Sequence, residues 1–214
     1  MIPKTIQQKL DEGRSYRAVA EVRLAGDAPD DRKIVEGYAT TFNQPYTLWS
    51  DDGYTVIEQI DRNAFDKTDM ADVIMQYDHE GRVFARISNG TLELNADDHG
   101  LHIRADLGGT EIGRQLYEEI KGGYTDKMSF GFTVDEDRRE VTENHETGET
   151  TILRTITAIR KLYDVSAVSL PANNATEISA RAFCEGAIAE AAEERRAHAE
   201  REARKRKIKI LMEV

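Results

Sequence analysis

Apolar and polar residues alternate with period two in a series of short runs along most of the chain. Because successive side chains of a β-strand point to opposite faces, such runs predict strands that are buried on one side. Turn-forming residues separate the runs, and Asn89-Gly90 favours a type I′ hairpin. The predicted strands are 15–24, 33–42, 54–60, 72–78, 82–87, 91–95, 101–107, 126–135, and one or two strands within 151–170.

The runs between residues 82 and 107 are close enough together to predict an antiparallel meander. Two segments interrupt the pattern of strands. Residues 43–53 predict an irregular loop, and residues 135–150 predict a polar hairpin or a loose loop. Seven or more evenly spaced strands favour a β-barrel or a sandwich in one β-dominated domain.

Helical periodicity is clearest in residues 110–123, where Thr110 is the predicted N-cap and two glycines are expected to end the helix. The apolar stripe of this helix consists of Ile112, Leu116 and Ile120. Residues 5–12 are weakly helical, and Asp61 is the predicted N-cap of one or two helical turns in 61–69. From Ala180 onward, Ala, Glu and Arg dominate and favour a helix.

Charge divides the chain of 214 residues into two parts. The formal net charge is −11, yet Glu193 to Lys209 holds eight basic against four acidic residues, a local +4 that leaves −15 for the rest. The acidic body disfavours nucleic-acid binding, and the basic segment lacks aromatic residues for base stacking. A nucleic-acid-binding barrel is therefore the weakest alternative.

Other function classes are limited by composition. No apolar run is long enough for a membrane helix, so we expect no membrane association. The single cysteine, Cys184, cannot form an internal disulfide and is too few for a structural zinc site, which favours a reducing cytoplasm. We expect neither a metal ion nor a cofactor, and His99 and His102 flank a predicted turn rather than form a ligand pair.

The run from Asp126 to Asp135 places Ser129 on the polar face of a predicted strand. The opposite, apolar face carries Met128, Phe130, Phe132 and Val134. A small hydroxyl next to Gly131 leaves room for a peptide backbone to approach, as a nucleophile requires. A surface serine on an amphipathic strand has the same pattern, so the strand alone leaves both interpretations open.

A nucleophilic serine needs a base within hydrogen-bond reach and a third group that orients the base. His79 is the candidate base, because it follows strand 72–78 and can project from a rigid element. Asp164 lies within an apolar run, where an unpaired buried carboxylate would be costly. It either pairs with a histidine or faces solvent at the edge of a strand.

Five blocks, in this order, resemble the prohead maturation proteases of tailed bacteriophages, a family related in fold to the herpesvirus assembly protease. They are GYATTFNQPY, IDRNAF, QYDHEGRVFARI, DKMSFGFTV and LYDVSAVSLPAN. The resemblance covers about Arg17 to Arg181. It implies a closed, mostly antiparallel β-barrel with helices around it, and a division into an N-terminal extension (1–14), a protease barrel domain (15–181) and a charged helical tail (182–214).

The resemblance also implies the roles of individual residues. His79 is the base and Ser129 the nucleophile of a serine endopeptidase with an acyl-enzyme mechanism. Asp164 takes the third place, where phage relatives often have Glu and the herpesvirus relatives a second histidine. His99, His102 and His145 are weaker contenders for that place, and Arg82, Arg160 and amides near Gly131 are candidate oxyanion donors.

The implied partners are the major capsid protein and its scaffold segment, met in the host cytoplasm inside the assembling procapsid. The implied activity includes self-cleavage, and a homo-oligomer is an open alternative to a monomer. The charged helical tail suits binding to scaffold or coat protein. The rival interpretation is a noncatalytic β-barrel assembly module, in which Ser129 and His79 have no chemical role.

Overall fold

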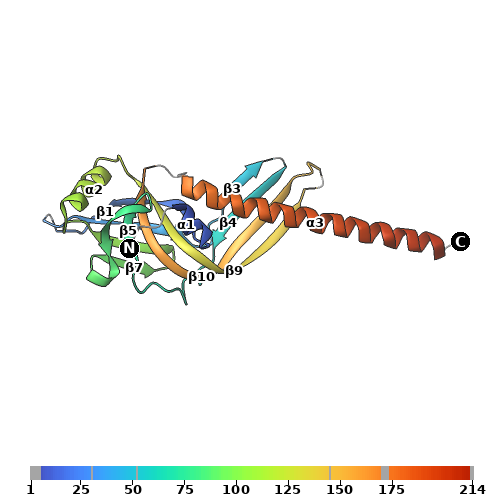
Figure 1. Ribbon diagram of the computed structural model, residues 1–214, viewed down its shortest axis with the longest axis horizontal. Coiled ribbons are helices and arrows are strands. Elements are labelled where there is room, and N and C mark those ends of the chain that lie inside the picture. Colours follow the sequence, from blue (N-terminus) through green and yellow to red (C-terminus); the bar gives the residue numbers. More distant parts are fainter. Residues whose placement is uncertain (1–5, 30, 52, 145, 170–173, 213–214) are drawn as a thin grey trace.

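The computed structural model describes residues 6–29, 31–51, 53–144, 146–169 and 174–212 (Figure 1). Its helices are α1 (Ile6–Asp11), α2 (Glu111–Lys121) and α3 (Asn174–Met212), together with a short 3₁₀ turn, η1 (Ile87–Asn89). Its strands are β1 (Ser15–Leu24), β2 (Ile34–Thr41), β3 (Tyr46–Asp51), β4 (Tyr54–Ile60), β5 (Ile74–Tyr77), β6 (Glu80–Arg86), β7 (Leu92–Ala96), β8 (Gly100–Asp106), β9 (Lys127–Glu143) and β10 (Thr150–Val168).

The strands form one mixed sheet in the order β3-β4-β10-β9-β1-β2-β8-β7, to which β5 is joined through β10 and β6 through β5. The prediction of a mostly β protein with helices is confirmed. The expectation of an antiparallel sheet is wrong in one place: β10 pairs with β9 along one edge, and with β4 and then β5, both parallel, along the other. Hydrogen bonds among the described strands do not close the sheet, so the closed barrel is not confirmed.

Several local predictions are wrong, and the reasons are tertiary. Residues 46–51, expected as a loop, form β3 because β4 offers them an antiparallel partner. The predicted meander is interrupted at Asn89-Gly90: Gly90 has φ +73 and ends η1, while β6 pairs with β5 and β7 with β8. In 135–150, by contrast, the hairpin, one of the two expected alternatives, is confirmed: the distal arms of β9 and β10 form it.

The helix α2 has the predicted boundaries and apolar face. Thr110 Oγ1 accepts a hydrogen bond from the Gly113 amide at 3.0 Å, and Gly122 is the C-cap. Leu116 and Ile120 are buried. The segment 61–69 is different, because it forms turns rather than helix, and Asp61 accepts from the Asn63 amide there.

Two hydrophobic cores hold the molecule together. The larger core lies within the curved part of the sheet and contains Phe130, Phe132 and Leu162, with α2 packed at its border. The smaller core joins the arm formed by β3, β4 and the distal parts of β9 and β10 to residues 183–191 of α3. Its buried members are Val56, Ile152, Cys184, Ala187 and Ala191. The predicted boundary between residues 181 and 182 therefore lies inside one continuous helix.

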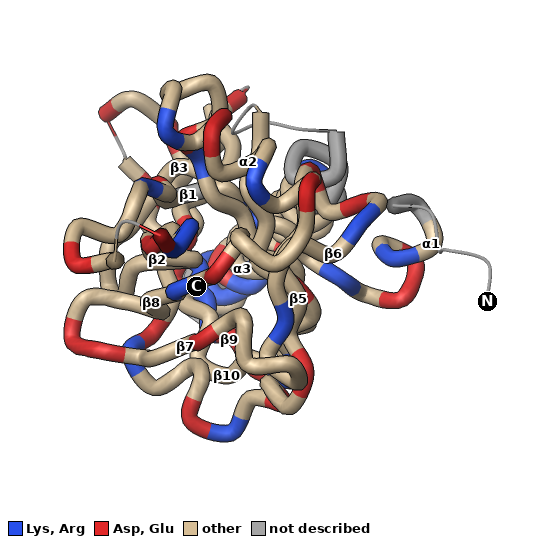
Figure 2. The backbone as a smooth tube through the Cα atoms, turned by 90° about the vertical axis from the view of Figure 1, so that its left-hand side faces the viewer, with Lys and Arg blue, Asp and Glu red and all other residues tan. Residues whose placement is uncertain are grey.

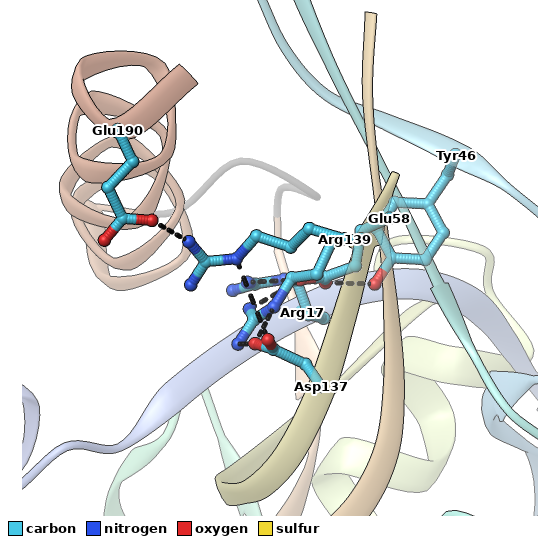
Figure 3. Close-up of polar contacts among 7 residues, drawn as sticks. Arg17, Tyr46, Glu58, Asp137, Arg139 and Glu190 are labelled. Atoms are coloured by element: carbon cyan, nitrogen blue, oxygen red, sulfur yellow. Dashed lines mark hydrogen bonds and ion pairs between the residues drawn. The ribbon is translucent and has the colours of Figure 1, made fainter. Parts of the chain in front are cut away.

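A buried cluster of charges, centred on Glu58 of β4, lies between these two cores (Figure 3). Glu58 Oε1 accepts from Arg17 Nε and from the Tyr46 hydroxyl, both at 2.5 Å, and Glu58 Oε2 accepts from Arg154 Nη1 at 2.8 Å. The other members extend the cluster to α3: Asp137, Arg139 and Glu190. We refer to these seven residues as the Glu58 cluster.

The exterior is charged with both signs. Viewed from the end that carries α2 and β6, lysines, arginines, aspartates and glutamates alternate along the loops (Figure 2). Within the part of the chain that is described, no helix is both long and apolar enough to cross a membrane.

Candidate active site

The structure brings His79, Ser129 and Asp164 together in one hydrogen-bonded row. His79 Nε2 lies 2.6 Å from Ser129 Oγ, and His79 Nδ1 lies 2.5 Å from Asp164 Oδ1. The three residues come from the β5–β6 turn, from β9 and from β10. All three side chains are buried, with at most 2% of their surface exposed.

The tight turn between β5 and β6 holds His79 in place. Asp78 and His79 have φ angles of +48 and +62, a left-handed conformation that non-glycine residues adopt at an energetic cost. The Asp78 amide donates to the carbonyl of Ala167, and its carboxylate accepts from the Ser169 amide and hydroxyl. Lys9 of α1 donates to the His79 carbonyl at 2.7 Å. These contacts stabilise the strained turn and aim the imidazole at the sheet.

The register between β9 and β10 places the other two residues. Ser129 is paired with Ser166 across the strands, and Asp164 with Gly131. A Cβ atom at position 131 would lie 2.5 Å from Asp164 Oδ2 and 2.8 Å from the Tyr16 ring. Glycine is therefore required, because any side chain there would displace the carboxylate that contacts His79.

Two further residues complete the site. Ser166 donates a hydrogen bond to Asp164 Oδ1 at 2.8 Å. The Tyr16 ring packs against the His79 imidazole with ring centroids 4.4 Å apart. The carboxylate thus has two donors, and the imidazole is held on its face as well as at both nitrogens.

The electrostatics of the row favour a charged carboxylate. Burial by itself would raise the pKa of Asp164, but the neighbouring His79 and the hydrogen bond from Ser166 lower it below its usual value. An ionised Asp164 can only accept a hydrogen bond from Nδ1, so Nδ1 carries the hydrogen in the neutral imidazole. Nε2 then has its lone pair directed at Ser129 Oγ and can accept the hydroxyl proton.

The alternative residues lie elsewhere. His99 and His102 pack around the ring of Tyr38, away from the row. His145 lies outside the described residues. Arg160 is exposed and pairs with Asp135, as expected for a surface ion pair.

Sequence reasoning gave no role to Ser166, Tyr16 or Lys9. Ser166 lies two residues after Asp164, so period-two alternation places it on the same strand face, and that signal could have found it. Tyr16 and Lys9 are separated from His79 by more than sixty positions, and no local pattern indicates their contact. The burial of the Ser129 strand also differs from expectation, because Met128 to Thr133 are buried on both faces of the strand.

The site contains no group of ligands suited to a metal ion. Among the described residues, no three His, Cys, Asp or Glu side chains converge in a way that could hold one. The side-chain oxygens around His79 belong to hydroxyl groups and to a single carboxylate.

A serine hydroxyl, an imidazole and a buried carboxylate in this order are typical of serine hydrolases. The family model described as caudovirus prohead serine protease matches residues 20–189, and the chain belongs to this family. The match includes all three residues of the row. Neither a search of curated proteins nor a search of solved structures finds a match. At the level of the family the protein is a serine peptidase, and such proteases work inside the assembling phage procapsid.

Proposed function

We propose that this protein is a serine endopeptidase that processes the scaffold segment and the major capsid protein, and also itself, during procapsid maturation. Ser129 is the nucleophile, His79 the general base and Asp164 the group that orients His79. The buried row of hydrogen bonds from Ser129 Oγ to Asp164 is the observation that carries this proposal. Membership of the prohead protease family supports the place of action.

The reaction is acyl transfer to the Ser129 hydroxyl. As Oγ attacks the peptide carbonyl, His79 Nε2 takes the hydroxyl proton, and Asp164 stabilises the imidazolium that forms. The same proton passes to the leaving amine when the tetrahedral intermediate collapses to the acyl-enzyme. A water molecule then attacks the acyl carbon while His79 takes one of the protons of the water. The bond between the acyl carbon and Ser129 Oγ breaks, and His79 returns the proton to Oγ.

Access to Ser129 requires a local opening. Ser129 and His79 have no exposed surface, so a substrate carbonyl has to displace a covering segment before attack. The helix α1 is one such segment, because Lys9 is bonded to the backbone of His79. In Figure 2 this helix lies at the edge of the body.

Reaction with a fluorophosphonate probe tests the proposal directly, because the probe labels an activated serine and needs no knowledge of the substrate. We expect wild type and Ser50→Ala to be labelled, since Ser50 is an exposed serine on β3. Ser129→Ala and His79→Ala should not be labelled and should leave coat protein uncut on co-expression. Both variants should remain folded by circular dichroism.

The rival proposal is a noncatalytic assembly module, and it predicts the opposite result. Labelling would then be absent from the wild type, or equal in wild type and Ser129→Ala. Either result would remove Ser129 as the nucleophile.

A further inference from the structure

A cleft of about 610 Å³ opens beside the proposed catalytic row. Its walls are the β5–β6 turn, β6 and the facing side of α2, which lie at one end of the molecule (Figure 2). Asp78 and Glu80, the two neighbours of His79 in sequence, line the cleft. A peptide that lies in the cleft therefore contacts the residues immediately before and after His79, the proposed base.

The cleft combines an apolar base with acidic walls. Phe84 and Ile112 supply apolar surface between β6 and α2. Three carboxylates line the walls against one cation, Arg82, which gives the lining a formal charge of −2. They are Asp78, Glu80 and Glu119.

Two of these carboxylates are available to a ligand. Glu80 and Glu119 are exposed, and no ion pair involves either of them within the described part of the chain. Asp78 is already hydrogen-bonded to Ser169. Lys9 is close enough to Glu80 to be affected by its charge, but its ammonium group donates to the His79 carbonyl instead.

The strand β6 offers a backbone edge along the same cleft. Among the described strands, β6 pairs only with β5, whereas β5 is also paired with β10. Glu80, Arg82 and Phe84 alternate with residues of the opposite face and line the cleft together. An extended peptide could add to such an edge and place every second side chain between β6 and α2.

We propose that this cleft binds the substrate as an extended peptide and selects for a lysine or arginine side chain next to an apolar one. Glu80 and Glu119 receive the cation, and Phe84 and Ile112 contact the apolar side chain. The inference rests on the proposed function, because the residues on either side of His79 in sequence line the cleft. It adds the substrate class: a basic, extended segment of the scaffold or coat protein.

Binding of two labelled decapeptides to the Ser129→Ala protein tests the proposal without peptide cleavage. The two peptides differ at two alternate positions only, where one has Lys and the other has Gln. All their other positions are Thr, Ser, Ala or Val. By fluorescence anisotropy, the Lys peptide should bind more tightly. Glu80→Gln and Glu119→Gln should each raise its Kd about fivefold and leave the Kd of the Gln peptide unchanged.

Glu111→Gln is the matched control. Glu111 is an exposed residue of α2 that does not line the cleft, so this substitution removes the same charge outside the cleft. Its Kd for the Lys peptide should stay within twofold of the parent. An equal loss in Glu111→Gln, equal binding of the two peptides, or no saturable binding of the Lys peptide would each overturn the cleft proposal.

Fluorophosphonate labelling of the wild type separates this proposal from the proposed function. Labelling without charge-dependent peptide binding would overturn the cleft and leave the peptidase. Charge-dependent binding that needs Glu80 and Glu119, in a protein that is not labelled, would support the cleft and overturn the catalytic role of Ser129.

Discussion

The protein contains two buried polar clusters, and they differ in how their charge is balanced. In the Glu58 cluster, the Glu58 carboxylate faces two permanent cations, Arg17 and Arg154, and a tyrosine hydroxyl. In the row that we propose to be catalytic, Asp164 faces one imidazole, whose charge can change, and the row ends at a neutral hydroxyl. The Glu58 cluster can only hold strands together, whereas the row can move a proton.

The contrast shows in the carboxylate pKa values as well as in the contacts. Burial would raise the pKa of Glu58, but the two arginines lower it to about 2. Burial would likewise raise the pKa of Asp164, and there the neighbouring His79 and one hydroxyl hydrogen bond, from Ser166, oppose it. A carboxylate held by arginines stays ionised at every pH at which the protein works, and no neighbour takes a proton from it. Mutations should therefore separate stability from activity.

The largest effect is expected from Asp164→Asn. The amide cannot hold His79 in the tautomer that accepts the Ser129 proton, so kcat should fall by about four orders of magnitude. Melting temperature should change little, because the side chain keeps its shape. Peptide hydrolysis and thermal unfolding measured on the same preparation check this. A loss of less than tenfold would assign the orienting role to another group.

Glu58→Gln should have the second largest effect, and it should act on stability. It removes the carboxylate that pairs with the buried Arg17 guanidinium, while Arg154 keeps its ion pair with Asp137. Breaking a buried ion pair in this way costs about 3–5 kcal/mol. Urea unfolding measures the loss. Asp135→Asn is the control, because it breaks the exposed pair with Arg160 and should cost less than about 1 kcal/mol. If folded Glu58→Gln protein lost kcat as strongly as Asp164→Asn, the two clusters would not be separable.

Acid should weaken the Glu58 cluster more gently than the substitution does. The folded-state pKa of Glu58, about 2, lies below its ordinary value of 4.5. Its contribution to stability is therefore complete above pH 4.5 and is lost as the pH falls toward 2. Unfolding free energies between pH 6 and pH 2.5 should decrease, and should decrease less in Glu58→Gln. Identical slopes in the two proteins would contradict the assignment.

The smallest effect is expected from Ser166→Ala, which removes one donor from Asp164. A single hydrogen bond to a charged group corresponds to about 1.5–3 kcal/mol, so kcat should fall by roughly ten- to a hundredfold with KM unchanged. In the Asp164→Asn background the same substitution should have no further effect, because Ser166 acts through Asp164. Additive losses would show a different role for Ser166.

Sequence reasoning found the row better than the fold around it. Ser129, His79 and Asp164 each lie in a short block with a chemical signal: a hydroxyl next to a glycine, a histidine after a strand, and a carboxylate in an apolar run. The Glu58 cluster gave no comparable signal, since Arg17 and Glu58 are 41 positions apart and each lies among ordinary strand residues. Contacts of this kind depend on which strands become neighbours.

Strand pairing was the part that local patterns could not predict. Asn89-Gly90 has the composition of a hairpin turn, yet β6 pairs with β5 and β7 pairs with β8. The parallel pairing of β10 with both β4 and β5 also depends on the long β9–β10 hairpin as a whole. Period two predicts that a segment is a strand, but it carries no information about its neighbour.

The length of α3 has a consequence for the kinetics of the self-processing that we propose. The helix has 39 residues, which corresponds to about 58 Å, and it leaves the body on the side away from α2 and β5 (Figure 1). Arg195 is the last described residue of the helix with an ion pair to the body. Residues 196–212 therefore project by about 25 Å.

Ser129 of the same molecule does not reach a peptide bond in that projecting segment while α3 stays docked. If the protease trims itself there, one molecule has to cut another. The reaction is then second order: doubling the concentration halves the time to half-completion, and dilution nearly stops it. A procapsid, which confines many copies in a small volume, would start such processing, and dilution in the surrounding cell would prevent it.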